Sequence, residues 1–205
     1  MYIPPHYKNN DPQISIEVIK ENAFGLLISS DSTYPFATHL PFLCREEDGK
    51  FKLFTHLAKA NPHAGVLMDK EVLAVFTGPH AYISATWYKN QRNVPTWNYA
   101  AVHVKGIARV LSNEDQILGL LQETVAFFED GNTEHHQQLP SEYKQALARE
   151  ITFIEIEVKE VESKIKFNQN KPKEDLLSVI RHLTDSGNYT SKLVAEQMRR
   201  FNALH

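Results

Sequence analysis

Apolar and β-branched runs of strand length follow one another along this chain, and turn residues rather than long helices separate most of them. A parallel, doubly wound sheet needs strands and helices in regular alternation, which this order lacks. The order therefore predicts a mainly β fold, an antiparallel barrel with peripheral helices. The expected strands lie at 23–30, 36–44, 51–57, 71–77, 96–111 and 151–166.

Helical patterns lie before, between and after these strands. Asp11 followed by Pro12 is typical of a helix start, and 112–115 resembles a capping box. We expect one compact molecule in which residues 1–170 form the barrel and residues 171–205 form a C-terminal helical pair packed on it. The expected helices lie at 11–22, 61–69, 112–130, 140–150, 173–184 and 189–204.

Two glycine positions are expected to interrupt strands. Gly78 is followed by Pro79, which cannot donate a hydrogen bond to a neighbouring strand, so the strand that begins at Glu71 is expected to end there. Gly106 is expected to mark a bulge or a bend, as found at barrel corners.

Charge and cysteine content argue against several classes of protein. A net charge of −3 does not suit a protein that coats nucleic acid with its whole surface. Cys44 is the one cysteine, so no intrachain disulfide can form, and the first residues do not resemble a signal peptide. No apolar run approaches the ~18 residues of a membrane helix. We therefore expect a soluble, cytoplasmic protein that has no membrane partner.

Three polar clusters interrupt the apolar patterns. Thr38 and His39 lie within one strand, and Lys59 follows another strand just before the helix start at Asn61. Exposed amides at a helix start, hydroxyl groups and a lysine together favour a phosphate. The third cluster, 78–99, holds both tryptophans, which make good walls for a planar ring. Each residue alone also suits a structural role, so the clusters indicate only a site for a flat anionic ligand.

Other chemistries find less support in the sequence. Histidines on neighbouring strands could converge on zinc or iron, but no tight metal-binding spacing is present, and we predict no metal. His135 and His136 fall in a polar loop and are expected to be solvated. Neither a nucleophile elbow nor a Walker loop occurs, which argues against acyl and phosphoryl transfer. The strand histidines weighed for a metal are His39, His56, His80 and His103.

Five strings lie along the chain: ATHLP at 37–41, HLAKANP at 56–62, GPHAYIS at 78–84, VPTWNYAAVH at 94–103 and KIKFNQN at 164–170. In this order they resemble the PaiB family, the FMN-binding negative transcriptional regulators. The likeness runs from the opening MYIP to the tail, and five long strings in one order are more specific than any single short motif. The resemblance implies a split β-barrel, similar to pyridoxamine-phosphate oxidases, that forms a homodimer with flavin sites at the subunit interface.

The resemblance also implies which residues hold FMN. Lys59 would neutralise the phosphate, helped by the Thr55 hydroxyl. Thr38 and His39 would contact the flavin ring, and Trp97 would cover the ring from the other subunit. Because Lys59 is the one strong cation near that phosphate, the FMN affinity is expected to be modest. The residues expected to bind the cofactor are Thr38, His39, Thr55, His56, Lys59, Asn61, Trp97, Asn98, His103, Lys166 and Gln169, and no catalytic residue is assigned.

The function implied by the resemblance is negative regulation of sporulation and of degradative-enzyme (protease) production, with the flavin as a sensor. The alternative is a flavin-dependent oxidoreductase acting on a small molecule. Residues 171–205 contain six Lys or Arg and four Asp or Glu, a net charge of +2, and their apolar positions suit packing on the barrel. Direct DNA binding by this tail is therefore not favoured over packing.

Overall fold

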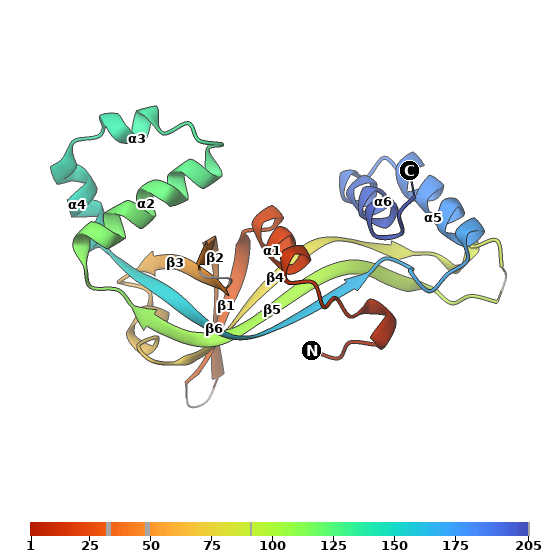
Figure 1. Ribbon diagram of the computed structural model, residues 1–205, viewed down its shortest axis with the longest axis horizontal. Coiled ribbons are helices and arrows are strands. Elements are labelled where there is room, and N and C mark those ends of the chain that lie inside the picture. The colour runs from red at the N-terminus through yellow and green to blue at the C-terminus, as the bar shows by residue number, and fades with distance from the viewer. Residues whose placement is uncertain (32–33, 48–49, 91, 205) are drawn as a thin grey trace. The chain divides into compact units, whose positions relative to one another are not determined.

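The computed structural model describes residues 1–31, 34–47, 50–90 and 92–204, and its strands form a six-stranded antiparallel barrel (Figure 1). The strands are hydrogen-bonded in the order β1-β2-β3-β6-β5-β4, and the barrel closes because β1 pairs with both β2 and β4. The prediction of a mainly β barrel with peripheral helices is confirmed. The strands are β1 (Phe24–Asp31), β2 (Tyr34–Glu47), β3 (Lys50–Ala58), β4 (Glu71–Ile83), β5 (Thr96–Val110) and β6 (Ile151–Lys166).

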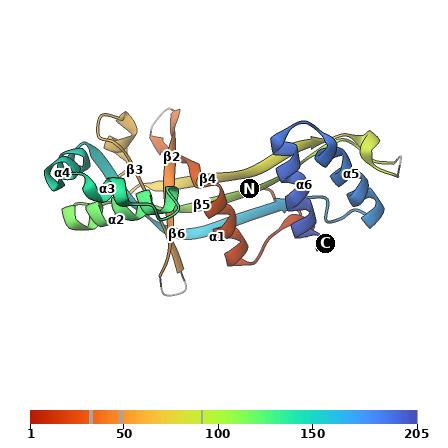
Figure 2. The ribbon, with the colours of Figure 1, turned by 90° about the horizontal axis from the view of Figure 1, so that it is seen from above.

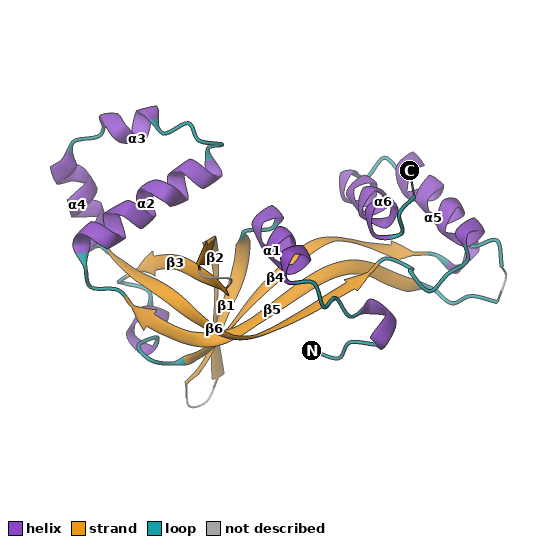
Figure 3. Ribbon diagram, viewed as in Figure 1, coloured by secondary structure: helices purple, strands orange, loops and turns teal. Residues whose placement is uncertain are grey.

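The α-helices occupy the ends of the chain and an insertion between β5 and β6 (Figure 3). Within the described residues, none is long and apolar enough to cross a membrane. The predicted helix at 61–69 is shorter than expected, a 3-10 helix that ends at Val66. The α-helices are α1 (Pro12–Glu21), α2 (Glu114–Phe128), α3 (Glu134–Gln138), α4 (Ser141–Arg149), α5 (Lys173–Asp185) and α6 (Tyr189–Phe201), and the 3-10 helices are η1 (Pro5–Tyr7), η2 (Pro62–Val66) and η3 (Ala85–Trp87).

Apolar side chains from several strands form the core. Phe42 of β2 and Phe76 of β4 are fully buried and meet edge to face, with ring centroids 5.0 Å apart. Burying one such side chain contributes about 1.5–3 kcal/mol to folding. Cys44 is also buried, and burial raises the pKa of its thiol to about 11, so the thiol stays protonated at neutral pH. Other fully buried strand residues are Leu27, Leu53, Ala74, Val104, Ala108 and Ile156.

The chain divides into two compact units that interleave in sequence. The first unit contains Met1–Val18, Thr77–Val102 and Glu162–His205, and the second contains Ile19–Phe76 and His103–Val161. Each of β4, β5 and β6 contributes residues to both units. The C-terminal helical pair therefore shares its unit with earlier segments of the chain, and the division at residue 170 stays a prediction.

The expectation that Gly78 and Pro79 end the fourth strand is wrong, because β4 continues to Ile83. Buried residues alternate regularly from Val72 to Gly78 and again from Ala81 to Ile83, with two less buried residues between them. This one-residue change of phase is the pattern of a strand irregularity, where a proline without an N–H group is tolerated.

Gly106 lies at a close contact between β5 and β6, and the bulge or bend expected there stays a prediction. Burial alternates regularly on both sides of it, whereas the break in alternation falls at 100–102. A Cβ atom at Gly106 would lie 2.5 Å from the Glu157 carbonyl oxygen and 2.7 Å from a methyl carbon of Ile156. Only glycine permits β5 to approach β6 this closely.

The insertion α2–α4 belongs to the second unit and packs on the outside of its strands (Figure 1). Leu120 of α2 is buried with Leu43, Phe54 and Phe153 from β2, β3 and β6. The expectation that His135 and His136 lie in a solvated loop is wrong in part, since both residues belong to α3 and His136 is half-buried.

The predicted C-terminal pair is confirmed as α5 and α6, which pack side by side (Figure 2). Leu176, Ile180 and Leu183 are buried as expected for a packed pair, whereas Leu177 is exposed. The buried Asp175 carboxylate accepts hydrogen bonds from the Lys89 and Asn90 amides at 2.7 and 3.0 Å, so α5 holds the loop after η3.

Candidate functional site

A buried histidine joins three chain segments in the second unit. The His63 ring is completely buried, with Nε2 2.9 Å from Ser29 Oγ and Nδ1 2.8 Å from Thr38 Oγ1. Phe36 stacks on it at 5.1 Å between centroids. Burial lowers the pKa of His63, so the ring is neutral at pH 7. The Thr38 hydroxyl is therefore engaged by His63, although the sequence assigned it to a ligand.

The turn that carries His63 also carries Lys59 and Asn61. The Asn61 side chain caps η2 by accepting a hydrogen bond from the His63 amide at 3.0 Å, and the Lys59 amide donates to the Glu150 carbonyl at 2.9 Å. The Lys59 side chain is exposed, and no described residue pairs with its ammonium group. A turn held by these two hydrogen bonds thus presents to solvent a cation that no described residue compensates, which suits an anion.

The remaining predicted residues of the second unit lie on strands. The Thr55 hydroxyl is buried and donates to the Pro41 carbonyl at 2.6 Å, so it is already satisfied inside the protein. His39 is exposed and stacks beside Phe24 at 6.0 Å. His103 is half-buried in β5.

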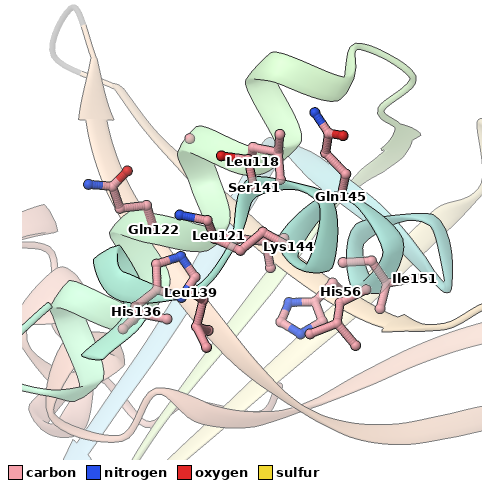
Figure 4. A pocket seen from close by; sticks show the side chains of 13 residues that line it. His56, Leu118, Leu121, Gln122, His136, Leu139, Ser141, Lys144, Gln145 and Ile151 are labelled. Carbon is pink, nitrogen blue, oxygen red and sulfur yellow. The ribbon is translucent and has the colours of Figure 1, made fainter. Parts of the chain in front are cut away.

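His56 points toward the helical insertion. Its ring stacks on Phe153 at 5.5 Å and lines a pocket with residues of α2 and α4 (Figure 4). Nδ1 is inaccessible to solvent and has no hydrogen-bond partner among the described residues. Burial lowers the pKa of His56 and keeps the ring neutral at pH 7.

In the first unit, Trp97 and Asn98 have opposite environments. Trp97 is 51% exposed and packs against His80 and Tyr82, with ring centroids 5.9 and 6.1 Å away. Asn98 is completely buried and donates to the Met198 sulfur at 3.4 Å, while its side-chain oxygen has no partner among the described residues. Trp97 is therefore available to a ligand or a partner, and Asn98 is covered.

Lys166 lies in a pocket of about 400 Å³ within the first unit, which we call the tyrosine–lysine pocket. Its ammonium donates to the Thr96 hydroxyl and lies 5.8 Å from the Tyr7 ring centroid. Gln169 does not line the pocket; it braces the adjoining turn through hydrogen bonds to the backbone of Ile165 and Phe167. The residues that define the pocket are Tyr2, Tyr7, Tyr88, Lys164, Lys166 and Lys171.

The charges of this pocket are unbalanced. Three lysines line it and no Asp or Glu does, among the residues that the structure describes. Lys164 and Lys171 lie 5.3 Å from the ring centroids of Tyr99 and Tyr88, respectively. Burial, and secondarily the charge of Lys164, lowers the pKa of Lys166. Bound negative charge would relieve both the repulsion and the desolvation.

Sequence reasoning missed two of the three lysines, Lys164 and Lys171, as site residues. Lys164 and Lys166 are two residues apart on β6, a spacing that places two side chains on one face of a strand, and this signal could have paired them. Lys171 follows a turn whose course only the tertiary structure shows. In the described part of the chain, no three His, Cys, Asp or Glu residues gather in a way that could hold a metal ion.

Residues 1–160 match the protein family described as "Putative FMN-binding domain". The chain belongs to this family. Over 201 residues it is 32% identical to the "Protease synthase and sporulation protein PAI 2" of Bacillus subtilis, an alignment that covers 97% of this chain and 96% of the relative. The PaiB resemblance of the sequence is thereby confirmed.

Solved structures support the barrel fold of this member of the FMN-binding domain family. The flavocytochrome Anf3 of Azotobacter vinelandii superposes with a TM-score of 0.65 at 14% identity, covering 80% of this chain and 72% of that one. The FAD- and heme-binding protein of Mycobacterium smegmatis gives 0.63 at 12% identity, with 78% and 73% covered. At these identities, the similarity demonstrates the shared fold alone.

Residues in each unit fit separate chemical groups of FMN. A phosphate dianion needs an uncompensated cation, which Lys59 supplies on a fixed turn. A planar ring with electronegative edges needs aromatic walls and donors, which the tyrosine–lysine pocket contains. Thr38 and Thr55 fit less well, since their hydroxyls already have partners within the protein.

Proposed function

We propose that this member of the FMN-binding domain family is a cytoplasmic homodimer that binds FMN and regulates sporulation and protease production, with the flavin as a sensor. The match of residues 1–160 to the family carries the flavin part of this proposal. The regulatory part is supported by the name of the Bacillus subtilis relative, which refers to protease synthesis and sporulation. Bound flavin would supply reversible electron uptake, which makes it suitable as a sensor.

In this proposal Lys59 neutralises the FMN phosphate, and Lys166 contacts the flavin ring from the partner subunit. Thr38 and Thr55 do not contact FMN in this proposal. Their hydroxyls instead hold His63 and β2 in place. Trp97, with half of its surface exposed, covers the ring from the partner subunit. His56 is left out of the flavin site because its ring lines the pocket of the helical insertion.

The test is a titration of the purified protein with FMN and with riboflavin, which lacks the phosphate, together with its native mass. We expect one FMN per chain in a dimer. Lys59→Ala should weaken FMN binding at least tenfold, because a charge-assisted contact contributes about 1.5–3 kcal/mol, and should leave riboflavin binding unchanged. Lys166→Ala should weaken the binding of both FMN and riboflavin. Lys192→Ala, at an exposed lysine of α6, is the control.

Each result has a separate meaning. If neither ligand binds, the flavin proposal is wrong. If Lys59→Ala binds FMN as the natural protein does, the phosphate is held elsewhere. A monomeric native mass contradicts the dimer. Sustained turnover with NADH or NADPH would mean that the protein is an oxidoreductase and not a sensor. Salt-dependent binding to a promoter fragment would mean that the protein regulates by binding DNA directly.

A further inference from the structure

The helical insertion and β3 enclose a pocket of about 470 Å³ in the second unit, which we call the insertion pocket (Figure 4). Its size falls within the range of small-molecule sites. Six of its thirteen lining residues are aliphatic: Leu118, Leu121, Val125, Leu139, Leu147 and Ile151. None of them belongs to the residues assigned to flavin.

The insertion pocket contains a lysine without a matching acid among the described residues. Lys144 of α4 lines it, and no Asp or Glu does, among the described residues. Lys144 is half-buried, and no described carboxylate pairs with its ammonium group. An apolar cavity that holds one uncompensated cation suits an apolar ligand that carries one negative charge.

His56 adds a second donor from the side of β3. Nδ1 is sealed without a partner, whereas Nε2 is neither sealed nor hydrogen-bonded to a described residue. A neutral imidazole has one N–H, and leaving a donor buried and unsatisfied costs about 1–3 kcal/mol. The favoured tautomer therefore carries its proton on Nε2, the ring nitrogen with access to the open side of the pocket.

We propose that the insertion pocket binds a small carboxylic acid with an apolar body. The carboxylate pairs with Lys144, the body lies on the leucines of α2 and α4, and His56 Nε2 donates to a ligand oxygen. This proposal does not rest on flavin binding, since neither Lys59 nor the tyrosine–lysine pocket contributes to it. The proposed ligand would contact both the helical insertion and β3 of the barrel.

The experiment uses decanoate as the probe, below micelle-forming concentrations, with the full-length protein and isothermal titration calorimetry. We expect saturable binding of one decanoate per chain and no comparable binding of decylammonium, which has the same body and the opposite charge. Lys144→Gln should lower the affinity for decanoate about fivefold, which is the effect of losing a partly exposed ion pair.

Gly119 allows the site itself to be blocked. It lies in α2 and lines the pocket, and a Cβ atom there would meet nothing within 4 Å. Gly119→Leu should abolish decanoate binding by filling the pocket, whereas Gly119→Ala is the matched control and should retain it. Thermal unfolding of both variants verifies that they fold, whether or not the protein binds flavin.

Three results would overturn the proposal. If decanoate binding does not saturate, the pocket is a gap in the packing and not a ligand site. Equal affinity of Gly119→Leu and the natural protein means that decanoate binds elsewhere. Equal binding of decanoate and decylammonium means that the pocket selects only for apolar surface.

Discussion

His63 and His56 occupy two regions of the same unit, and both have a pKa that burial lowers. The region around His63 is closed: hydroxyl groups satisfy both ring nitrogens and Phe36 covers one face. The region around His56 is open: neither nitrogen has a partner among the described residues, and the ring borders a pocket. Burial alone therefore does not separate a structural histidine from a ligand-binding one, whereas hydrogen bonding does.

The largest expected effect tests the closed region. His63→Leu should lower the free energy of unfolding by about 3 kcal/mol, because it removes the partner of the buried Ser29 hydroxyl and of the half-buried Thr38 hydroxyl. Urea denaturation measures this loss. In a double-mutant cycle, Thr38→Val should lower the free energy of unfolding less in the His63→Leu background than in the natural protein. Equal costs would mean that the hydrogen bond seen here contributes nothing to stability.

Acid should destabilise both regions. A histidine whose folded pKa lies below its ordinary value of 6.5 takes up protons more readily when unfolded, so its contribution is complete above pH 6.5 and declines as the pH falls toward the folded pKa. Denaturant midpoints between pH 8 and pH 5 measure the decline. His56→Phe should make the decline shallower without removing it, and a decline of unchanged slope would contradict the burial of His56.

Gly119→Ala tests how open the pocket is. Because a Cβ atom there meets open space and alanine is the better helix former, the free energy of unfolding should rise by about 1 kcal/mol. Gly65→Ala is a useful control, since its Cβ would also meet open space but it lies in a 3-10 helix. A loss of stability at Gly119 would show that the insertion packs more tightly there.

The smallest effect is expected for His56→Phe, which removes no hydrogen bond to a described residue and keeps the stacking on Phe153. The free energy of unfolding at pH 7 should stay within about 1 kcal/mol of that of the natural protein, while binding of an acid in the insertion pocket weakens. A loss as large as that of His63→Leu would remove the distinction between the two regions.

Strand patterns and helix starts could be predicted from the sequence because they depend on neighbours along the chain. The alternation in β6, the turn at Asn61 and the helices of the tail follow from side-chain periodicity and capping. A local rule failed at Pro79, where the strand was predicted to end and in fact continues to Ile83. The buried face of β4 changes there, which local sequence does not encode. At Gly106, local sequence could not reveal the close approach to Glu157 and Ile156 of β6.

The sequence by itself determined the barrel class, the PaiB resemblance and the presence of a lysine on a turn beside a short helix. Only the tertiary structure decided which polar side chains are free to act. Thr38 and Thr55 look like ligand donors in the sequence, yet partners distant in sequence already satisfy them. Lys171 and Lys144 look like ordinary surface charges, yet each lines a pocket that no described Asp or Glu lines. Hydrogen-bond satisfaction and charge balance are properties of groups that meet in space, and residue type alone does not encode them.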